Sequence, residues 1–182
     1  ETKELVSFLG EQGFSWSAAG VRAHTADLEM LKFWKKNGCE SVIFGIESGS
    51  PTMLEVMEKK ITVEKNIEAL KYVYEAKLAT VTQFVIGMPG ETDQTIEETI
   101  DFLLKTMKYY PDPFRKKITI LASVNYAQSL PGTPLYEYAR EHGFVGRTVD
   151  EEEKYLIAIK IKDFSIFVLK NIQVYIRPEI LP

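Results

Sequence analysis

Cysteine is almost absent from this chain of 182 residues, in which Cys39 stands alone. One thiol excludes an internal disulfide, and it excludes a cysteine-based metal centre built from this chain by itself. Cys39 lies in "NGCESVIF", where a helix is expected to end and an apolar strand to begin. We therefore expect a buried structural thiol in a reducing, cytoplasmic compartment.

Long apolar runs and strong positive charge are also missing. No stretch approaches the roughly 20 apolar residues that cross a bilayer, so we expect no membrane span. The net charge of −4 makes nucleic acid an unlikely partner, because nucleic-acid binding favours a basic face. The one dense basic cluster, "RKK" at 115–117, is interpreted as a solvated loop.

Several functional motifs are lacking as well. Neither GxGxxG nor GxxxxGK[ST] occurs, which leaves nucleotide binding by a standard phosphate loop unsupported. Ser48 lacks the GxSxG elbow of many hydrolases, and His24 and His142 are too isolated to predict a metal site. The chain begins without methionine or a targeting pattern, so we expect residues 1–12 to be the end of a preceding helix.

What is present is an alternation of two kinds of segment. Apolar stretches at 14–21, 41–46, 80–88 and 117–124 predict strands, and segments of helical periodicity separate them. Thr25 and Thr133 are predicted N-caps, and a helix is expected from about Thr62 to Lys77 with Ile67, Leu70 and Tyr74 on its apolar face. The alternation predicts an α/β fold with a parallel sheet covered by helices, either a partial barrel or an open sheet.

Unusual residues gather where these strands end. Arg22 and His24 follow the first strand, "ESGS" the second, "GMPGE" the third and "NYAQSLPGTP" the fourth. Ligands of parallel α/β folds bind at the carboxyl ends of the strands, so this pattern favours a ligand-binding face. Glu47 in "ESGS" has two interpretations at this point, an acid that closes its own turn or a ligand-binding carboxylate.

Three segments together resemble a known family. "GIESGSPTMLEVMEKKITVEKNIEAL", "QFVIGMPGETDQTIEETIDFL" and "SLPGTPLYEYAREHG" resemble the later half of a radical S-adenosylmethionine barrel over residues 13–145. The stretch "AGVRAHTADLEMLKFWKKNGCESVIFGIESGS" is most similar to the cobalamin-associated branch of oxidative cyclases and methyltransferases. The resemblance implies a fragment of a partial (β/α)6 TIM-like barrel, with its third to sixth strands here and residues 146–182 as a C-terminal extension, helical or strand-like.

The resemblance also implies roles for individual residues. Glu47 would reach the ribose or the amino-acid end of S-adenosylmethionine, Lys59 its carboxylate and Gln83 its ribose, while Arg22 would face the cofactor carboxylate or the substrate. The adenine side would be lined by the following residues: Val85, Ile86, Gly87, Met88, Pro89, Asn125, Tyr126 and Ala127. These assignments make Glu47 a residue that holds a cofactor.

One departure from the family changes the expected activity. The family's CxxxCxxC loop supplies three thiolates to a [4Fe–4S] cluster, and Cys39 lies in neither that spacing nor that place. The resemblance thus implies a parent enzyme in which the cluster cleaves S-adenosylmethionine to a 5′-deoxyadenosyl radical that abstracts hydrogen from a small-molecule substrate. If the parent belongs to the cobalamin-associated branch, an upstream domain would carry cobalamin. The chain itself is expected to be inactive, with no catalytic residue and no metal ligand.

Two alternatives remain open from the sequence. The parent could be a methylthiotransferase-like enzyme that acts on tRNA or protein, or the chain could be a non-catalytic binding or scaffold protein on the same fold. An exposed edge of the sheet, where strands are missing, also predicts pairing of two copies into a homodimer.

Overall fold

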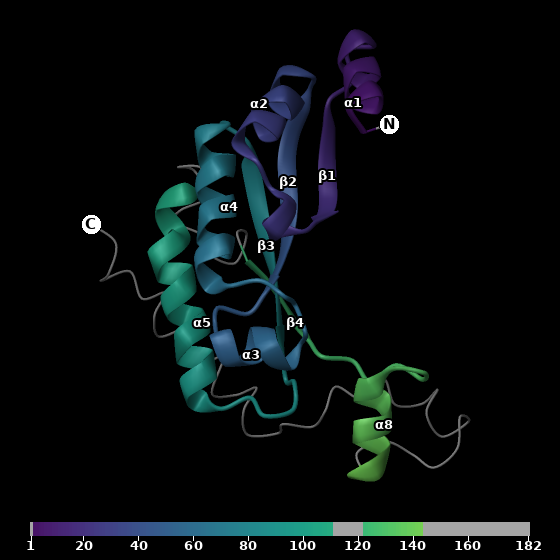
Figure 1. Cartoon of the computed structure of the whole chain (residues 1–182), viewed down its shortest axis with the longest axis vertical. Coiled ribbons are helices and arrows are strands. Elements are labelled where there is room, and N and C mark those ends of the chain that lie inside the picture. Colours follow the sequence, from purple (N-terminus) through teal and green to yellow (C-terminus); the bar gives the residue numbers. More distant parts are fainter. Residues whose placement is uncertain (1, 111–121, 144–182) are drawn as a thin grey trace.

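Four parallel strands form the centre of the molecule. The computed structural model describes residues 2–110 and 122–143. Within them, β1 (Trp16–Val21), β2 (Cys39–Glu47), β3 (Ala79–Ile86) and β4 (Ala122–Tyr126) pair as one sheet in the order of the chain (Figure 1). All three pairings are parallel, so all four strands end at the same edge of the sheet, as the alternation predicted.

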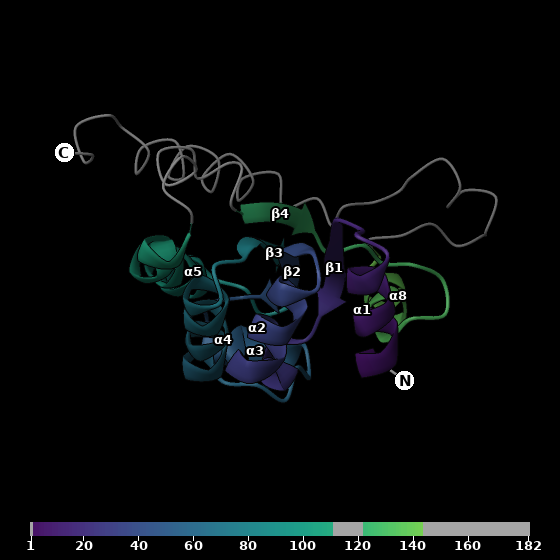
Figure 2. The same ribbon diagram turned by 90° about the horizontal axis from the view of Figure 1, so that it is seen from above.

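Helices cover one face of this sheet. The helices and 3-10 turns are α1 (Thr2–Glu11), η1 (Ala23–Thr25), α2 (Leu28–Lys36), α3 (Pro51–Val56), α4 (Val63–Glu75), α5 (Asp93–Thr106), η2 (Met107–Tyr109) and α8 (Pro134–Glu141). Figures 1 and 2 show α2, α3, α4 and α5 on one side of the sheet, with α1 beyond β1. α3 lies at the carboxyl end of the strands, below the sheet in Figure 1.

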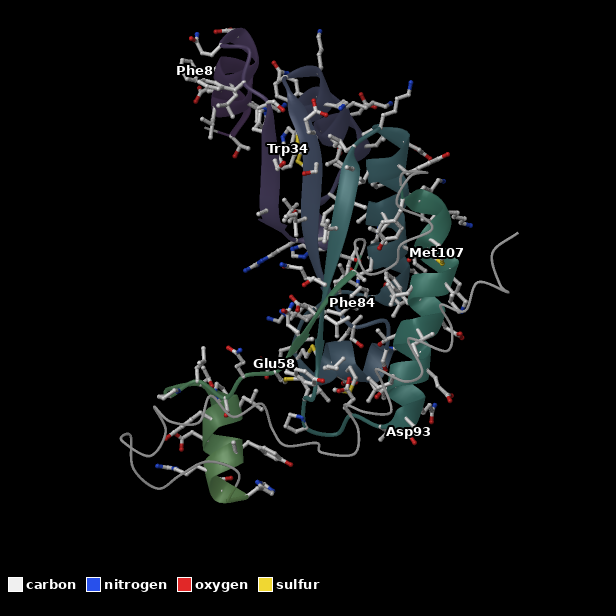
Figure 3. All side chains as sticks on the ribbon, turned by 180° about the vertical axis from the view of Figure 1, so that it is seen from behind. Phe8, Trp34, Glu58, Phe84, Asp93 and Met107 are labelled. Atoms are coloured by element: carbon white, nitrogen blue, oxygen red, sulfur yellow. The ribbon has the colours of Figure 1, made fainter. Side chains whose placement is uncertain are left out.

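The alternation of side chains along the strands explains this one-sided cover. Val42, Phe44 and Ile46 of β2 are fully buried against the helices, and residues between them are only partly buried. Phe84 of β3 lies between the sheet and α5 (Figure 3), where its ring meets the edge of Phe102 with centroids 6.0 Å apart. Each such buried side chain contributes about 1.5–3 kcal/mol to stability. The other face of β2, β3 and β4, here called the inner face, carries Gly45, Gln83, Val85, Ser123 and Asn125 in register.

Most predicted helix ends are confirmed, and two details are wrong. Thr133 caps α8 as predicted, and α4 begins directly after Thr62, whose side chain caps it. Thr25 does not cap α2, because it belongs to η1, and Asp27 accepts the Met30 N–H at 2.9 Å in its place. Tyr74 is 49% exposed, since Val73 takes the buried position beside Leu70.

Other predictions have mixed outcomes. Cys39 is fully buried, as expected. The short helix α3 was not predicted, because six residues give no helical period. No helix among the described residues is long and apolar enough to span a membrane. The predictions for 111–121 and 146–182 fall outside the described residues.

Candidate functional site

Strand β2 ends in an unusual turn centred on Glu47. The backbone of Glu47 has a φ of 67°, and the Ser48 N–H donates to the Ile46 carbonyl at 2.9 Å. A hydrogen bond across one residue closes a γ-turn, whose form with positive φ is rare and strained for a residue with a side chain. Such strain is found mainly at functional sites, where the surrounding structure maintains it. Glu47 thus does close a turn, at a conformational cost that a simple chain reversal does not require.

Lys59 is placed by the end of α3. The Glu58 N–H bonds the Glu55 carbonyl at 2.9 Å and the Lys59 N–H bonds the Leu54 carbonyl at 3.0 Å. These two bonds form a Schellman motif, which usually has glycine where Glu58 stands with a φ of 52°. In such motifs the residue at the position of Lys59 is frequently hydrophobic, and here it is a lysine.

Glu47 and Lys59 meet as an ion pair. The Lys59 Nζ lies 3.0 Å from the Glu47 Oε1, and the two side chains are 40% and 19% exposed. An ion pair this accessible contributes only about 0–1 kcal/mol, so a ligand can compete with it. Among the described residues, no donor reaches the other carboxylate oxygen of Glu47. The pair therefore presents both an acceptor and an ammonium group to a ligand.

Gln83 lies beside this pair on the inner face. Gly45 of β2 is the register partner of Gln83 on β3, and Gln83 in turn pairs with Ser123 on β4. A Cβ on Gly45 would come within 2.7 Å of the Glu47 Oε1, so the carboxylate folds back over Gly45. The missing side chain at Gly45 thus brings the Glu47 carboxylate toward the exposed amide of Gln83.

These residues line a cleft at the carboxyl ends of β1, β2 and β3. It has a volume of about 730 Å³, which is within the usual range for small-molecule sites. Arg22, His24 and Lys60 line it together with the Glu47–Lys59 pair and Gln83. Among the described residues Arg22 and Lys60 have no carboxylate partner. Glu58, labelled in Figure 3, also lines this end of the sheet. The cleft offers more cationic than anionic groups.

The left-handed backbone conformation is concentrated in the cleft. Glu47, Glu58, Lys60 and Lys77 are the non-glycine residues with positive φ in the described parts of the chain. The first three line the cleft, whereas Lys77 lies at the other end of the sheet. This clustering marks the cleft as the part of the fold in which local strain is maintained.

The residues predicted for the adenine side are only partly brought together. Val85 and Asn125 are register partners on the inner face, and the Asn125 Nδ2 lies 3.4 Å from the Ser123 Oγ. Ile86 is turned to the helices, where it packs against Ile96, so its side chain faces away from the cleft. Ala127 is buried, and its N–H donates to the Ile86 carbonyl at 2.8 Å.

Sequence reasoning missed a carboxylate in the third strand-end motif. Glu91 folds back so that its Oε2 accepts the Gly87 N–H, and its own N–H bonds the Met88 carbonyl at 3.1 Å. Burial raises the pKa of the Glu91 carboxyl above its usual range, although the bond from Gly87 opposes this. The Gly87 N–H is therefore engaged within the turn. Its signal in the sequence was an acid directly after the "GMPG" turn.

The donor groups fit one of the expected cofactors and not the other. A carboxylate beside an ammonium group and an amide, in a cleft of this size, suits the ribose and amino-acid groups of S-adenosylmethionine. A [4Fe–4S] cluster does not fit, because its ligands are thiolates and Cys39 is buried in the helix-covered core. In the described parts of the chain, no three His, Cys, Asp or Glu side chains are grouped to hold a metal ion.

Two curated proteins show what the sequence is similar to. An uncharacterized methyltransferase of Pyrococcus horikoshii is 33% identical over 176 residues, which cover 92% of this chain and 35% of that protein. The anaerobic magnesium-protoporphyrin IX monomethyl ester cyclase of Cereibacter sphaeroides is 33% identical over 115 residues, or 63% of this chain and 17% of the cyclase. The chain thus spans about a third or less of the length of these relatives.

A solved structure shows the same fold. The radical S-adenosylmethionine methyltransferase TsrM of Kitasatospora setae, with cobalamin and a [4Fe–4S] cluster bound, superimposes with a TM-score of 0.62. The match has 17% sequence identity and covers 81% of this chain and 29% of TsrM. Four parallel strands with helices on one face therefore correspond to part of the barrel of such enzymes.

The family assignment rests on a direct match as well. The model of the radical SAM superfamily matches residues 2–103, more than half of the chain, and includes the turn at Glu47 and Lys59. Members of this superfamily use S-adenosylmethionine and a [4Fe–4S] cluster. The chain belongs to the radical SAM superfamily.

Proposed function

We propose that the cleft at Glu47 binds the ribose and amino-acid part of S-adenosylmethionine, and that the inner face near Val85 and Asn125 receives its adenine. The whole protein would be a radical SAM enzyme of the methyltransferase and cyclase type that acts on a small molecule. The observation that carries the proposal is the strained turn at Glu47, at the carboxyl end of β2, whose carboxylate forms an accessible ion pair with Lys59 beyond α3. The similarity to methyltransferase and cyclase relatives supports the reaction type.

The chain's own residues would bind and orient the cofactor. Glu47 can accept hydrogen bonds from two ribose hydroxyls or from the ammonium group, while Lys59 and Arg22 offer charge to the carboxylate. When bound, S-adenosylmethionine would supply a 5′-deoxyadenosyl radical through one-electron reduction that cleaves its sulfur–C5′ bond and releases methionine, and that chemistry belongs to the cofactor. The role of these strands is to fix where the adenosyl group points.

We further propose that the cluster thiolates lie outside this chain, so that the chain alone is inactive. Anaerobic reconstitution with iron and sulfide should then give no stable cluster, because one buried thiol cannot replace three. A stoichiometric [4Fe–4S] absorption and Mössbauer signal would contradict this division. Cys39→Ala serves as the control, since any weak iron binding that survives it does not use the thiol.

Binding of the cofactor can be tested on the chain itself. S-adenosylmethionine, adenosine and methionine would each be titrated into the 15N-labelled protein, and amide shifts of residues 45–48, 59 and 83–87 followed. Glu47→Gln should weaken S-adenosylmethionine binding about 10- to 100-fold, because it removes a charge-assisted hydrogen bond of about 1.5–3 kcal/mol. Titrations of Glu47→Gln with adenosine and with methionine show how much of this loss in affinity belongs to each half of the cofactor.

The same strand provides a matched control. Glu40, at the opposite end of β2, also pairs with a lysine at 3.0 Å, that of Lys35. Glu40→Gln removes an equivalent surface ion pair and should leave binding unchanged. Equal effects of the two substitutions, or no shifts at the cleft with any of the three compounds, would refute the proposed site and favour a non-catalytic scaffold.

A further inference from the structure

The turn that follows Glu47 lies directly against α5, a helix about fifty residues later in the chain. A Cβ on Gly49 would come within 2.4 Å of the Phe102 Cβ, 2.7 Å of the Thr99 Cα and 3.0 Å of the Glu98 carbonyl oxygen. Two of these three atoms belong to the helix backbone. Glycine at this position therefore brings the chain into closer contact with α5 than any side chain would allow.

One hydroxyl joins the helix to the turn. The Thr99 Oγ1 accepts the Gly49 N–H at 3.0 Å and lies 3.0 Å from the Ser48 Oγ. Ser48 is 1% exposed and Thr99 is 8% exposed, so water does not compete for these bonds. Since Thr99 also donates to the Thr95 carbonyl, the Ser48 hydroxyl is the donor of the bond that they share.

The rest of the turn depends on the same helix. The Ser50 N–H donates to the Ser48 Oγ at 3.0 Å, and the Ser50 hydroxyl bonds the Glu98 carboxylate. Ser48, Gly49 and Ser50 thus each bond to α5 or to one another, directly after the strained residue. None of them lines the cleft.

We propose that Thr99 is a positioning residue for Glu47, and that α5 maintains the γ-turn which aims the Glu47 carboxylate into the cleft. The proposal rests on the proposed function for its consequence in ligand binding. Its structural part stands apart, because a left-handed φ at glutamate persists only where neighbouring bonds impose it. Without the Thr99 hydroxyl, the buried Gly49 N–H loses its acceptor. The turn then lowers its free energy by moving to a position where water accepts from this N–H.

A second threonine on α5, Thr106, is a control that distinguishes a positioning role from a general effect on stability. Thr106 is fully buried, and its Oγ1 donates to the Phe102 carbonyl. The Thr99 Oγ1 likewise donates to the Thr95 carbonyl one turn earlier in the helix. In the described parts of the chain, the hydrogen bonds of the Thr106 hydroxyl go to the Phe102 and Leu103 carbonyls and not to the turn at 48–50. Thr106→Val and Thr99→Val therefore remove similar hydroxyls from one helix, and only the Thr99 hydroxyl bonds to the turn.

The test compares Thr99→Val, Thr99→Ser and Thr106→Val in the 182-residue chain by urea unfolding, hydrogen exchange and S-adenosylmethionine titration. Thr99→Val should speed exchange of the Gly49 amide on the order of 10-fold at matched global stability, and it should change the three-bond HN–Hα coupling of Glu47. It should also weaken S-adenosylmethionine binding several-fold. Thr99→Ser should restore all three values, and Thr106→Val should lower only the global stability.

The outcomes separate the two proposals. Unchanged exchange at Gly49 and unchanged coupling at Glu47 in Thr99→Val would overturn the positioning role. An equal loss of affinity in Thr106→Val would do so as well, since the effect would then be one of stability. If the wild-type chain shows no shifts with S-adenosylmethionine, the proposed function fails, and the exchange and coupling data still decide whether α5 maintains the turn.

Discussion

Replacing Gly49 with alanine adds one methyl group at the closest contact between the turn after β2 and α5. The new Cβ would meet the Phe102 Cβ at 2.4 Å and the Thr99 Cα at 2.7 Å, both shorter than real Cβ contacts. Backbone atoms of a helix cannot rotate away, so α5 or the turn must shift. Overpacking of this kind costs about 1–3 kcal/mol, and the rigid partners place it in the upper part of that range.

An opposing effect acts through the unfolded chain. Gly49 does not have a positive φ, so alanine is compatible with its backbone, and Gly→Ala at such sites gains about 0.4–1 kcal/mol. The net loss should therefore be about 1–2 kcal/mol. With a urea m-value of roughly 2 kcal/mol/M, the midpoint of unfolding should fall by about 0.5–1 M.

Gly45→Ala provides the contrast, because its Cβ would meet only the end of the flexible Glu47 side chain, at 2.7 Å. That carboxylate can turn aside, so the urea midpoint should change little while S-adenosylmethionine binding weakens. A urea midpoint for Gly49→Ala that equals or exceeds the wild-type value would refute the reasoning. It would mean that the added methyl group causes no overpacking large enough to offset the stabilisation from the unfolded chain.

Three further predictions concern the core and the pH dependence. Cys39 should resist alkylation until the protein unfolds, because it is fully buried and burial raises the pKa of its thiol; rapid labelling of the native protein by iodoacetamide would contradict this. Burial raises the folded-state pKa of Glu91 above its ordinary value of 4.5, so the stability this group contributes is present below that pH and is lost as the pH rises through the folded pKa. Glu91→Gln can still accept from Gly87, so the urea midpoint of this variant should rise relative to that of the wild type as the pH increases from 4 to 7. A difference between the two midpoints that stays constant with pH would exclude the effect. Leu70→Ala should lower the free energy of unfolding by about 2–5 kcal/mol and Leu104→Ala by less than about 1 kcal/mol, since Leu70 is fully buried and Leu104 is 39% exposed; equal losses in urea titrations would contradict the core assignment.

Much of the fold could be predicted from the chain. The apolar strands and the helical stripes between them predict a parallel sheet, and the helix starts expected at about Thr62 and at Thr133 are correct. Tyr74 was misplaced because a tyrosine fits a helical stripe equally well whether it is buried or lies on its border. Val73, one position earlier, is smaller and fits beneath the sheet.

The resemblance named Glu47, Lys59 and Gln83, and the structure brings these three residues around one cleft, while their role in binding stays a prediction. The local geometry could not be predicted. The side chain of Ile86 faces the opposite way, since a strand alternates its faces and Val85 already occupies the inner one. Thr99 could not be found, because a threonine within a polar helix segment gives no sign of a partner fifty residues earlier.

The contact between Thr99 and the turn at 48–50 joins parts of the chain that are synthesised far apart. Residues 51–98 must form α3, α4, β3 and the first turns of α5 before the Ser48 and Gly49 groups find their partner. Closing a loop of that length is entropically unfavourable until β2 and β3 have paired. The γ-turn at Glu47 should therefore be among the last features to form during folding, so that a nascent chain acquires its cleft only after α5 has docked.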